Sequence, residues 1–174
     1  NFNNNKYTQM ATNLDDVKRN ATSMVGSADG EGLKKLVRDL LGENGNDAIA
    51  SPGLLFVSEL VSREVDLFCG STGNSSLPQE VLQDLPEYIV TTIKANPLRT
   101  AYDDSDYVCR YAIFNYNKEC NDFKTGAESL CNLNLDSTVK RYTVDEKCNI
   151  LVTCAEAFMH EEANDSAELM CTKA

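Results

Sequence analysis

Three carboxylates stand close together near the middle of the chain. Asp103, Asp104 and Asp106 fall within a single short stretch, and carboxylates at this spacing can bind Ca²⁺ when backbone carbonyls complete the coordination shell. The glycine and the final glutamate of an EF-hand loop are both absent around them. We therefore expect a solvated acidic stretch that caps the segment after it, and no metal site.

The one histidine, His160, is the imidazole that any hydrolase triad would have to use. It falls near the predicted end of a helix, where a positive charge is favourable without a catalytic role. The sequence contains no nucleophile elbow, phosphate-binding loop, dinucleotide fingerprint or His-Glu-x-x-His motif. We expect a protein that is not an enzyme, with no catalytic residue and no cofactor.

Seven cysteines offer a different chemistry, the formation of disulfides. None belongs to a C-x-x-C pair and one histidine is too few for a Cys/His zinc site, so metal binding is not favoured. This many cysteines in 174 residues are typical of an oxidising compartment. We predict disulfides within the set Cys69, Cys109, Cys120, Cys131, Cys148, Cys154 and Cys171, with a connectivity that the spacing leaves open.

An odd count leaves one cysteine outside an intramolecular framework. That thiol is either buried and inert or bonded to a second chain. Cys69 is far in sequence from the next cysteine and Cys171 lies near the last residue, so these two are the candidates for an interchain bond, with Cys69 slightly preferred. Cys148 and Cys154 lie on different faces of one predicted helix and should not pair with each other.

Three Asn-x-Ser/Thr sequons accompany the cysteines, and none has proline in the middle. They begin at Asn20, Asn74 and Asn164, and the Gly- and Ser-rich context of Asn74 makes it the best acceptor. The sequence begins at Asn1 without a signal h-region, as a processed secretory product would. These features together predict a secreted, extracellular glycoprotein whose signal peptide has been removed.

Charge and hydropathy argue against two classes of partner. The chain has 27 acidic and 16 basic residues, and its net charge of -11 repels nucleic acid. The longest apolar stretch is far shorter than the ~20 residues that span a bilayer, so we expect no membrane span. The expected partner is another protein or a second copy of the chain, with an interchain disulfide as one route to an oligomer.

Helical periodicity runs through most of the sequence, because apolar residues recur at spacings of three and four. Helices are predicted over about residues 6–25, 30–41, 54–68, 78–84 with 86–95 as two helices or one kinked helix, 144–159 and 164–171. Ser76 with Gln79, Asp84 with Glu87 and Thr143 with Glu146 have the spacing of capping boxes. Residues 107–116 fit a helix or a strand, residues 117–135 look irregular, and 139–144 suggest a short strand.

These elements predict a mainly α fold, a disulfide-stapled bundle of about five to seven helices with minor or no β structure. The length is that of one domain, so residues 1–174 are expected to form a single unit. Its halves differ, since residues 1–68 contain no cysteine and residues 69–174 contain all seven. Helix packing should stabilise the first half, and disulfides the second.

Aromatic side chains are concentrated just after the acidic stretch. Tyr102, Tyr107, Tyr111, Phe114 and Tyr116 could anchor a protein interface or line a pocket, although packing between helices is their commoner role. We expect a non-enzymatic protein that acts by association, as a subunit of an extracellular assembly or a receptor ligand. The alternative is an extracellular helical carrier of a small apolar ligand, held between these aromatics and Phe56, Leu60 and Phe68.

Overall fold

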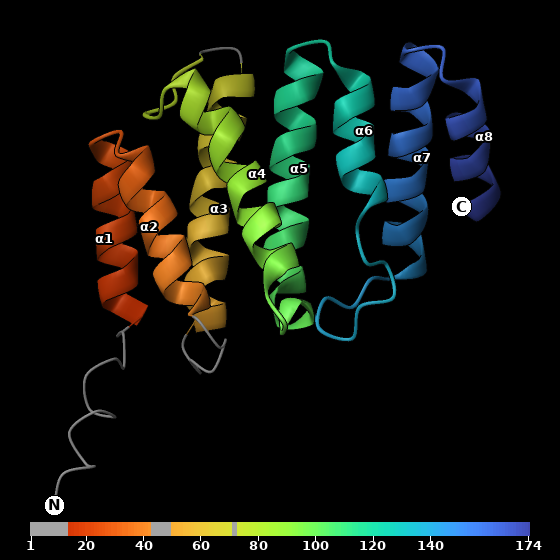
Figure 1. The fold of residues 1–174 in the computed structure, drawn as a ribbon. Helices are drawn as coiled ribbons and strands as arrows, with labels where there is room; N and C mark the ends of the chain where they lie inside the picture. Colours follow the sequence, from red (N-terminus) through yellow and green to blue (C-terminus); the bar gives the residue numbers. More distant parts are fainter. Residues whose placement is uncertain (1–13, 43–49, 71–72) are drawn as a thin grey trace, which may run out of the picture.

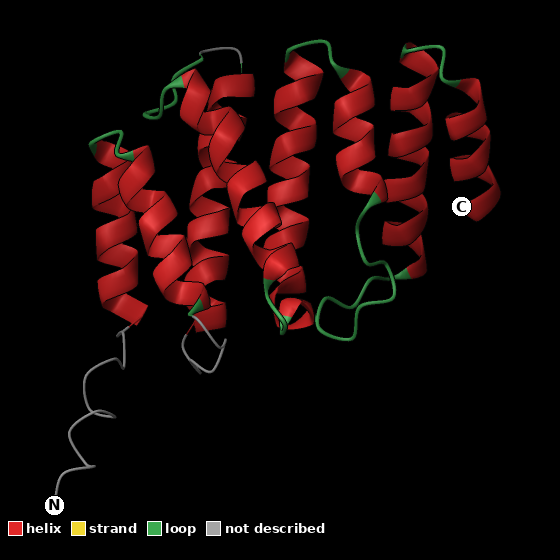
Figure 2. Cartoon of the chain, in the orientation of Figure 1, coloured by secondary structure: helices red, strands yellow, loops and turns green. Residues whose placement is uncertain are grey.

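The computed structural model describes residues 14–42, 50–70 and 73–174, and all the regular structure in these ranges is helical (Figure 2). The helices run from α1 at one end of the molecule to α8 at the other, with α3 packed directly on α5 and α4 lying against both (Figure 1). They are α1 (Leu14–Gly26), α2 (Gly30–Leu41), α3 (Ala50–Cys69), α4 (Gln79–Ala95), the short 3₁₀ helix η1 (Arg99–Tyr102), α5 (Asp103–Glu119), α6 (Phe123–Cys131), α7 (Val144–His160) and α8 (Asn164–Lys173).

Two hydrophobic cores lie along this row, and α5 belongs to both. The first core is built by α1 to α5, with Cys109, Ala112 and Ile113 as part of the α5 contribution. The second core is built by α5 to α8, and here α5 contributes Phe114 with Tyr107 packed against it. Because α5 contributes apolar side chains to both cores, it is the helix that joins the two halves of the fold.

The contact between α5 and α6 is made close by a glycine. A Cβ atom at Gly126 would lie 3.2 Å from the Phe114 ring and 3.3 Å from the Phe114 carbonyl oxygen. A side chain there would push α6 away from α5, so glycine sets the distance between the two helices. α7 then packs on α6 and α8 packs on α7, extending the row.

Capping explains where several helices begin. The Asp29 carboxylate accepts from the Gly32 N–H at the start of α2, as the sequence predicts. The predicted capping box of Thr143 and Glu146 is confirmed at α7, where each side chain binds the other residue's backbone N–H. A third cap was not predicted: Asp122 accepts from the Thr125 N–H and starts α6.

The other two predicted capping boxes are wrong, because α4 is a single helix. Pro78 precedes it without a side-chain cap, and Pro86 lies inside it. Pro86 is fully buried within the first core, where its ring packs like any apolar side chain. A single helix, and not two, is therefore the correct alternative of those that the sequence leaves open.

The predicted short strand at residues 139–144 is also wrong. The Ser137 hydroxyl accepts from the backbone N–H groups of Val139 and Lys140, which folds this segment into a turn. Val144 is then taken into the first turn of α7 and is 82% exposed. Local side-chain hydrogen bonds and the Thr143 cap thus outweigh the β-branched composition.

The helix count is higher than predicted, with eight α-helices in the described ranges instead of five to seven. Residues 107–116 lie inside α5, and the segment expected to be irregular contains α6. The part of the predicted first helix before Leu14 and the predicted turn at 43–47 lie outside the described residues. No described helix is long and apolar enough to cross a membrane. All seven cysteines carry free thiols in the structure, so disulfide stapling stays a prediction.

Candidate functional site

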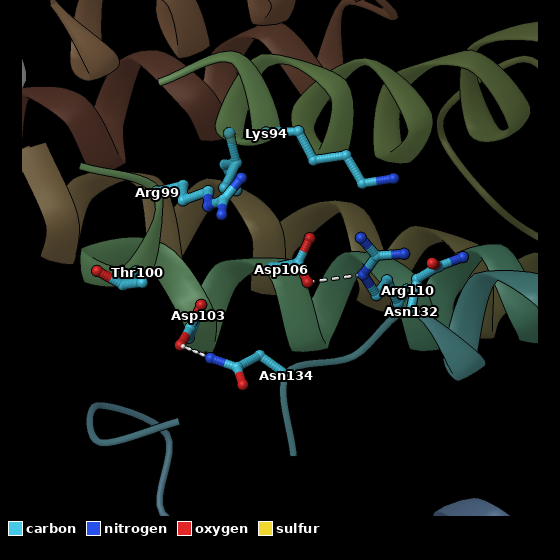
Figure 3. Close-up of a pocket in the computed structure, with 9 residues that line it drawn as sticks. Lys94, Arg99, Thr100, Asp103, Asp106, Arg110, Asn132 and Asn134 are labelled. Atoms are coloured by element: carbon cyan, nitrogen blue, oxygen red, sulfur yellow. Dashed lines mark hydrogen bonds and ion pairs between the residues drawn. The ribbon is translucent and has the colours of Figure 1, made fainter. Parts of the chain in front are cut away.

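A polar pocket lies where four segments meet: the end of α4, η1, the start of α5 and the chain after α6 (Figure 3). Its volume is about 360 Å³. The lining consists of one apolar side chain and eight polar or charged ones: Ile93, Lys94, Arg99, Thr100, Asp103, Asp106, Arg110, Asn132 and Asn134. We refer to it as the α4–α5 pocket.

A buried ion pair forms one wall of this pocket. Arg110 Nε donates to Asp106 Oδ2 across 2.6 Å, one turn apart on α5, and only 4% and 12% of the two side chains are exposed. Arg110 Nη1 also donates to the carbonyl oxygen of Ser129 on α6, at 2.9 Å. The guanidinium therefore neutralises a buried carboxylate and ties α6 to α5 at the same time.

The second oxygen of the same carboxylate has no hydrogen-bond partner. Among the described residues, Asp106 Oδ1 is the one buried side-chain nitrogen or oxygen without a hydrogen-bond partner. An unsatisfied buried acceptor costs about 1–3 kcal/mol, and proteins rarely leave one without a reason. Asp106 lines the pocket, so the pocket wall includes a buried acceptor that no group of the protein satisfies.

Two cations face the pocket without a carboxylate of their own. Lys94 in the last turn of α4 and Arg99 at the start of η1 form no ion pair with any residue that the structure describes. The remaining acid, Asp103, accepts from the Asn134 amide at 3.2 Å. In Figure 3, Lys94 and Arg99 lie on the α4 side of the pocket and the Asp103–Asn134 bond lies across from them. The lining therefore holds three cations and two carboxylates, a small positive excess in a chain whose net charge is -11.

The turn between α4 and η1 positions Arg99. Asn96 Oδ1 accepts from the Leu98 N–H at 2.9 Å, while Asn96 Nδ2 donates to the Leu41 carbonyl at the end of α2, at 3.4 Å. The Asn-Pro sequence that ends α4 is thus anchored on both sides.

The aromatic residues predicted as an interface or pocket are divided between the two cores. Tyr102 and Tyr116 are buried in the first core, where Tyr116 stacks on Phe68 with ring centroids 5.5 Å apart. In the second core the ring centroids of Tyr107 and Tyr111 are 4.8 Å apart, and this core also buries Phe114. Burial raises the pKa of Tyr111 to about 12. These side chains fill contacts between helices.

Other residues singled out in the sequence have mainly structural surroundings. His160 stacks on Phe123 with ring centroids 4.4 Å apart. Asp103 and Asp104 lie in the first turn of α5, where the helix dipole stabilises negative charge. In the described part of the chain, no three His, Cys, Asp or Glu side chains gather closely enough to hold a metal ion.

The three sequon asparagines are all exposed, Asn20 on α1, Asn74 between α3 and α4, and Asn164 at the start of α8. The loop that carries Asn74 is fixed by a buried carboxylate. Glu64 on α3, 3% exposed, accepts from the Ser75 hydroxyl at 2.9 Å and from the Ser76 N–H at 2.7 Å.

The cysteines differ widely in their surroundings. Cys109 and Cys154 are buried, Cys69 and Cys148 are partly buried, and Cys120, Cys131 and Cys171 are exposed. The Cys69 thiol donates to the Asn115 carbonyl at 3.4 Å, and burial raises its pKa to about 11. Cys171 is the more accessible of the two thiols that the sequence singles out for an interchain bond.

No known protein-family model matches the sequence, and no curated protein is significantly similar to it. Function must therefore be inferred from the side chains themselves.

Sequence reasoning missed the principal residues of the pocket. Asp106 was grouped with its acidic neighbours, and Lys94, Arg99 and Arg110 were not singled out. One signal was present: Asp106 and Arg110 stand four apart in an aromatic stretch, the spacing at which side chains of one helix face meet. Nothing local indicates that residues 94, 99 and 132–134 converge on that pair.

The buried pair gives a stability prediction. Arg110→Met should lower the free energy of unfolding by about 3–5 kcal/mol, because it leaves the Asp106 charge buried without its counter-ion. The double variant Asp106→Leu/Arg110→Met should regain much of that loss. Urea denaturation followed by circular dichroism measures both effects.

The matched control is Lys147→Met, which removes the exposed ion pair of Lys147 Nζ with Asp136 Oδ1 at 2.8 Å. It should change stability little, since water screens exposed pairs. Equal losses for Arg110→Met and Lys147→Met would contradict the assigned role of Arg110.

Proposed function

We propose that this protein is a non-enzymatic binding protein that holds a small polar molecule in the α4–α5 pocket. The observation that carries the proposal is the unpartnered Asp106 Oδ1, buried in a pocket that also presents Lys94 and Arg99. A ligand that matches these groups has a hydrogen-bond donor for Asp106 and an anionic group for the two cations. Small-molecule carriage was the sequence-based alternative, but this lining favours a polar ligand over an apolar one.

The depth of each group orients the ligand. Asp106 is 9% exposed, whereas Lys94 and Arg99 are exposed at the rim. The donor of the ligand would therefore point inward and its anionic group outward. A pocket of about 360 Å³ is at the small end of the range for ligand sites, which suits a molecule the size of a phosphorylated amino alcohol.

The side chains of the pocket support binding more than reaction. Its lining has one hydroxyl, on Thr100, and no histidine or cysteine. The histidine of the chain is stacked on Phe123, on α6 and away from this lining. Nothing in the lining combines a nucleophile with a base, the arrangement that covalent catalysis requires.

The binding proposal is tested with phosphoethanolamine, whose ammonium group has N–H donors, and with phosphocholine, whose quaternary ammonium has none. Isothermal titration calorimetry should show tighter binding of phosphoethanolamine. Arg99→Ala should weaken that binding by about 10- to 100-fold, the effect of one charge-assisted hydrogen bond. The exposed Lys124→Ala on α6 is the matched control and should bind like wild type.

Two results would contradict the proposal. One is equal affinity of wild type and Arg99→Ala for phosphoethanolamine. The other is a titration in which neither phosphate ester binds the wild-type protein at millimolar concentration.

Association between copies of the chain is our second candidate, favoured by apolar side chains at the α8 end of the row. Val152 and Met159 are 41% and 62% exposed and lie two turns apart on one face of α7, and Leu169 on α8 is 52% exposed. Exposed apolar side chains that share a face are a common feature of interaction surfaces. They support the sequence-based expectation of an oligomer.

Self-association predicts that wild type has the mass of a dimer in light scattering at micromolar concentration and that Met159→Glu has the mass of a monomer. Leu67→Glu, a change at a 40% exposed position on α3, should leave the dimer intact. A monomeric wild-type protein would remove this candidate.

We also propose the setting that the sequence predicts, a secreted, disulfide-stapled glycoprotein. The exposure of Asn20, Asn74 and Asn164 supports it, since an acceptor asparagine must stand in solvent. Expression in a secreting eukaryotic cell should yield a protein that loses mass on enzymatic deglycosylation, with Asn74 and Asn20 converted to aspartate. Asn74→Gln should lose one glycan. A secreted wild-type protein whose mass does not change on deglycosylation would contradict the proposed glycosylation.

A further inference from the structure

Two cysteines lie where α6 packs on α7. Cys131 ends α6 and Cys154 lies in the middle of α7. The Cys154 sulfur also lies 3.9 Å from the carbonyl oxygen of Ala127. Ala127 precedes Cys131 by one helical turn, so the buried sulfur rests on the face of α6 that Cys131 shares.

The two thiols differ in accessibility and acidity. Cys131 is exposed, and the interaction with the Cys154 thiol, together with the charge of Lys173, lowers its pKa. Cys154 is buried, and the Cys131 thiol and burial raise its pKa. An accessible, more acidic thiol beside a buried one is the arrangement in which the first attacks a disulfide and the second resolves the product.

A third sulfur lies beside this pair. Met170 Sδ on α8 is 3.4 Å from Cys131 Sγ, so the end of α6 also contacts α8. α8 packs mainly on α7, and both stand at the end of the row. A covalent bond at this point would hold α7, and α8 with it, to the rest of the fold.

We propose that Cys131 and Cys154 form an intramolecular disulfide that joins α6 to α7. The oxidant is a thiol disulfide such as oxidised glutathione. The Cys131 thiolate attacks one glutathione sulfur, which forms a mixed disulfide and releases one glutathione thiolate. Cys154 then loses its proton and attacks the Cys131 sulfur, and the second glutathione leaves. Two protein thiols are oxidised, and one glutathione disulfide is reduced to two thiols.

Cys109 is then the cysteine expected to stay unpaired. This residue is fully buried in the first core, and burial raises its pKa to about 12. Such a thiol is inert in the folded protein. Of the two possibilities for the unpaired cysteine, the buried, inert one therefore fits Cys109, and neither Cys69 nor Cys171 has to be unpaired.

The test uses the full chain equilibrated with a mixture of oxidised and reduced glutathione, alkylated without reduction, digested and mapped by mass spectrometry. The expected product is a linked peptide containing Cys131 and Cys154, with Cys109 alkylated only after unfolding. Independent alkylation of both Cys131 and Cys154 in the oxidised, folded protein would overturn the proposal. So would a link from either of them to another cysteine.

Stability gives a second readout that does not depend on mapping. Cys131→Ser changes an exposed position, so the variant should fold, and its Tm should fall by about 5–10 °C relative to oxidised wild type. Reduction, which breaks this and any other disulfide, should lower the Tm of wild type by at least as much as the substitution does. Cys148→Ser, on the same helix, should keep the linked peptide that contains Cys131 and Cys154. Equal Tm values for oxidised wild type and Cys131→Ser would contradict the bond.

Discussion

A guanidinium group cannot be buried without acceptors, and the way Arg110 meets this constraint organises the middle of the molecule. Its Nε is bound by a carboxylate on its own helix and its Nη1 by a backbone carbonyl on α6. The first bond fixes the orientation of Asp106 and leaves Oδ1 free at the pocket wall. The second holds α6 beside α5, close to the glycine contact at Gly126. One side chain therefore connects the packing of the second core with the chemistry of the site.

The elements that could be predicted are those whose signals are local. Asp29 and the Thr143–Glu146 box mark helix starts because capping involves residues three apart. α5 was ambiguous because both of its sides are buried, which removes the one-sided apolar pattern that identifies a helix. α6 was missed because it is short: Phe123, Ala127 and Leu130 follow helical spacing toward the second core, but over too few turns to mark a helix.

The pocket could not have been assembled from the sequence. Its cations come from the end of α4 and from η1, its ion pair from α5 and its two asparagines from the chain after α6. Only folding brings residues 94 and 134 together, and the Asn96 turn that directs Arg99 depends on a carbonyl of α2. The acidic stretch shows the same limit, because one of its three aspartates lies on the buried side of α5 and the other two do not.

Because α5 belongs to both cores, it determines how the molecule unfolds. If either core melts, one side of α5 loses its apolar contacts, and the other core loses the surface on which it is built. The two halves therefore unfold together, although cysteines are confined to one of them. In amide hydrogen exchange, the interior of α5 would open only with global unfolding. α8 has neighbours on one side only, so it can fray while the rest stays closed.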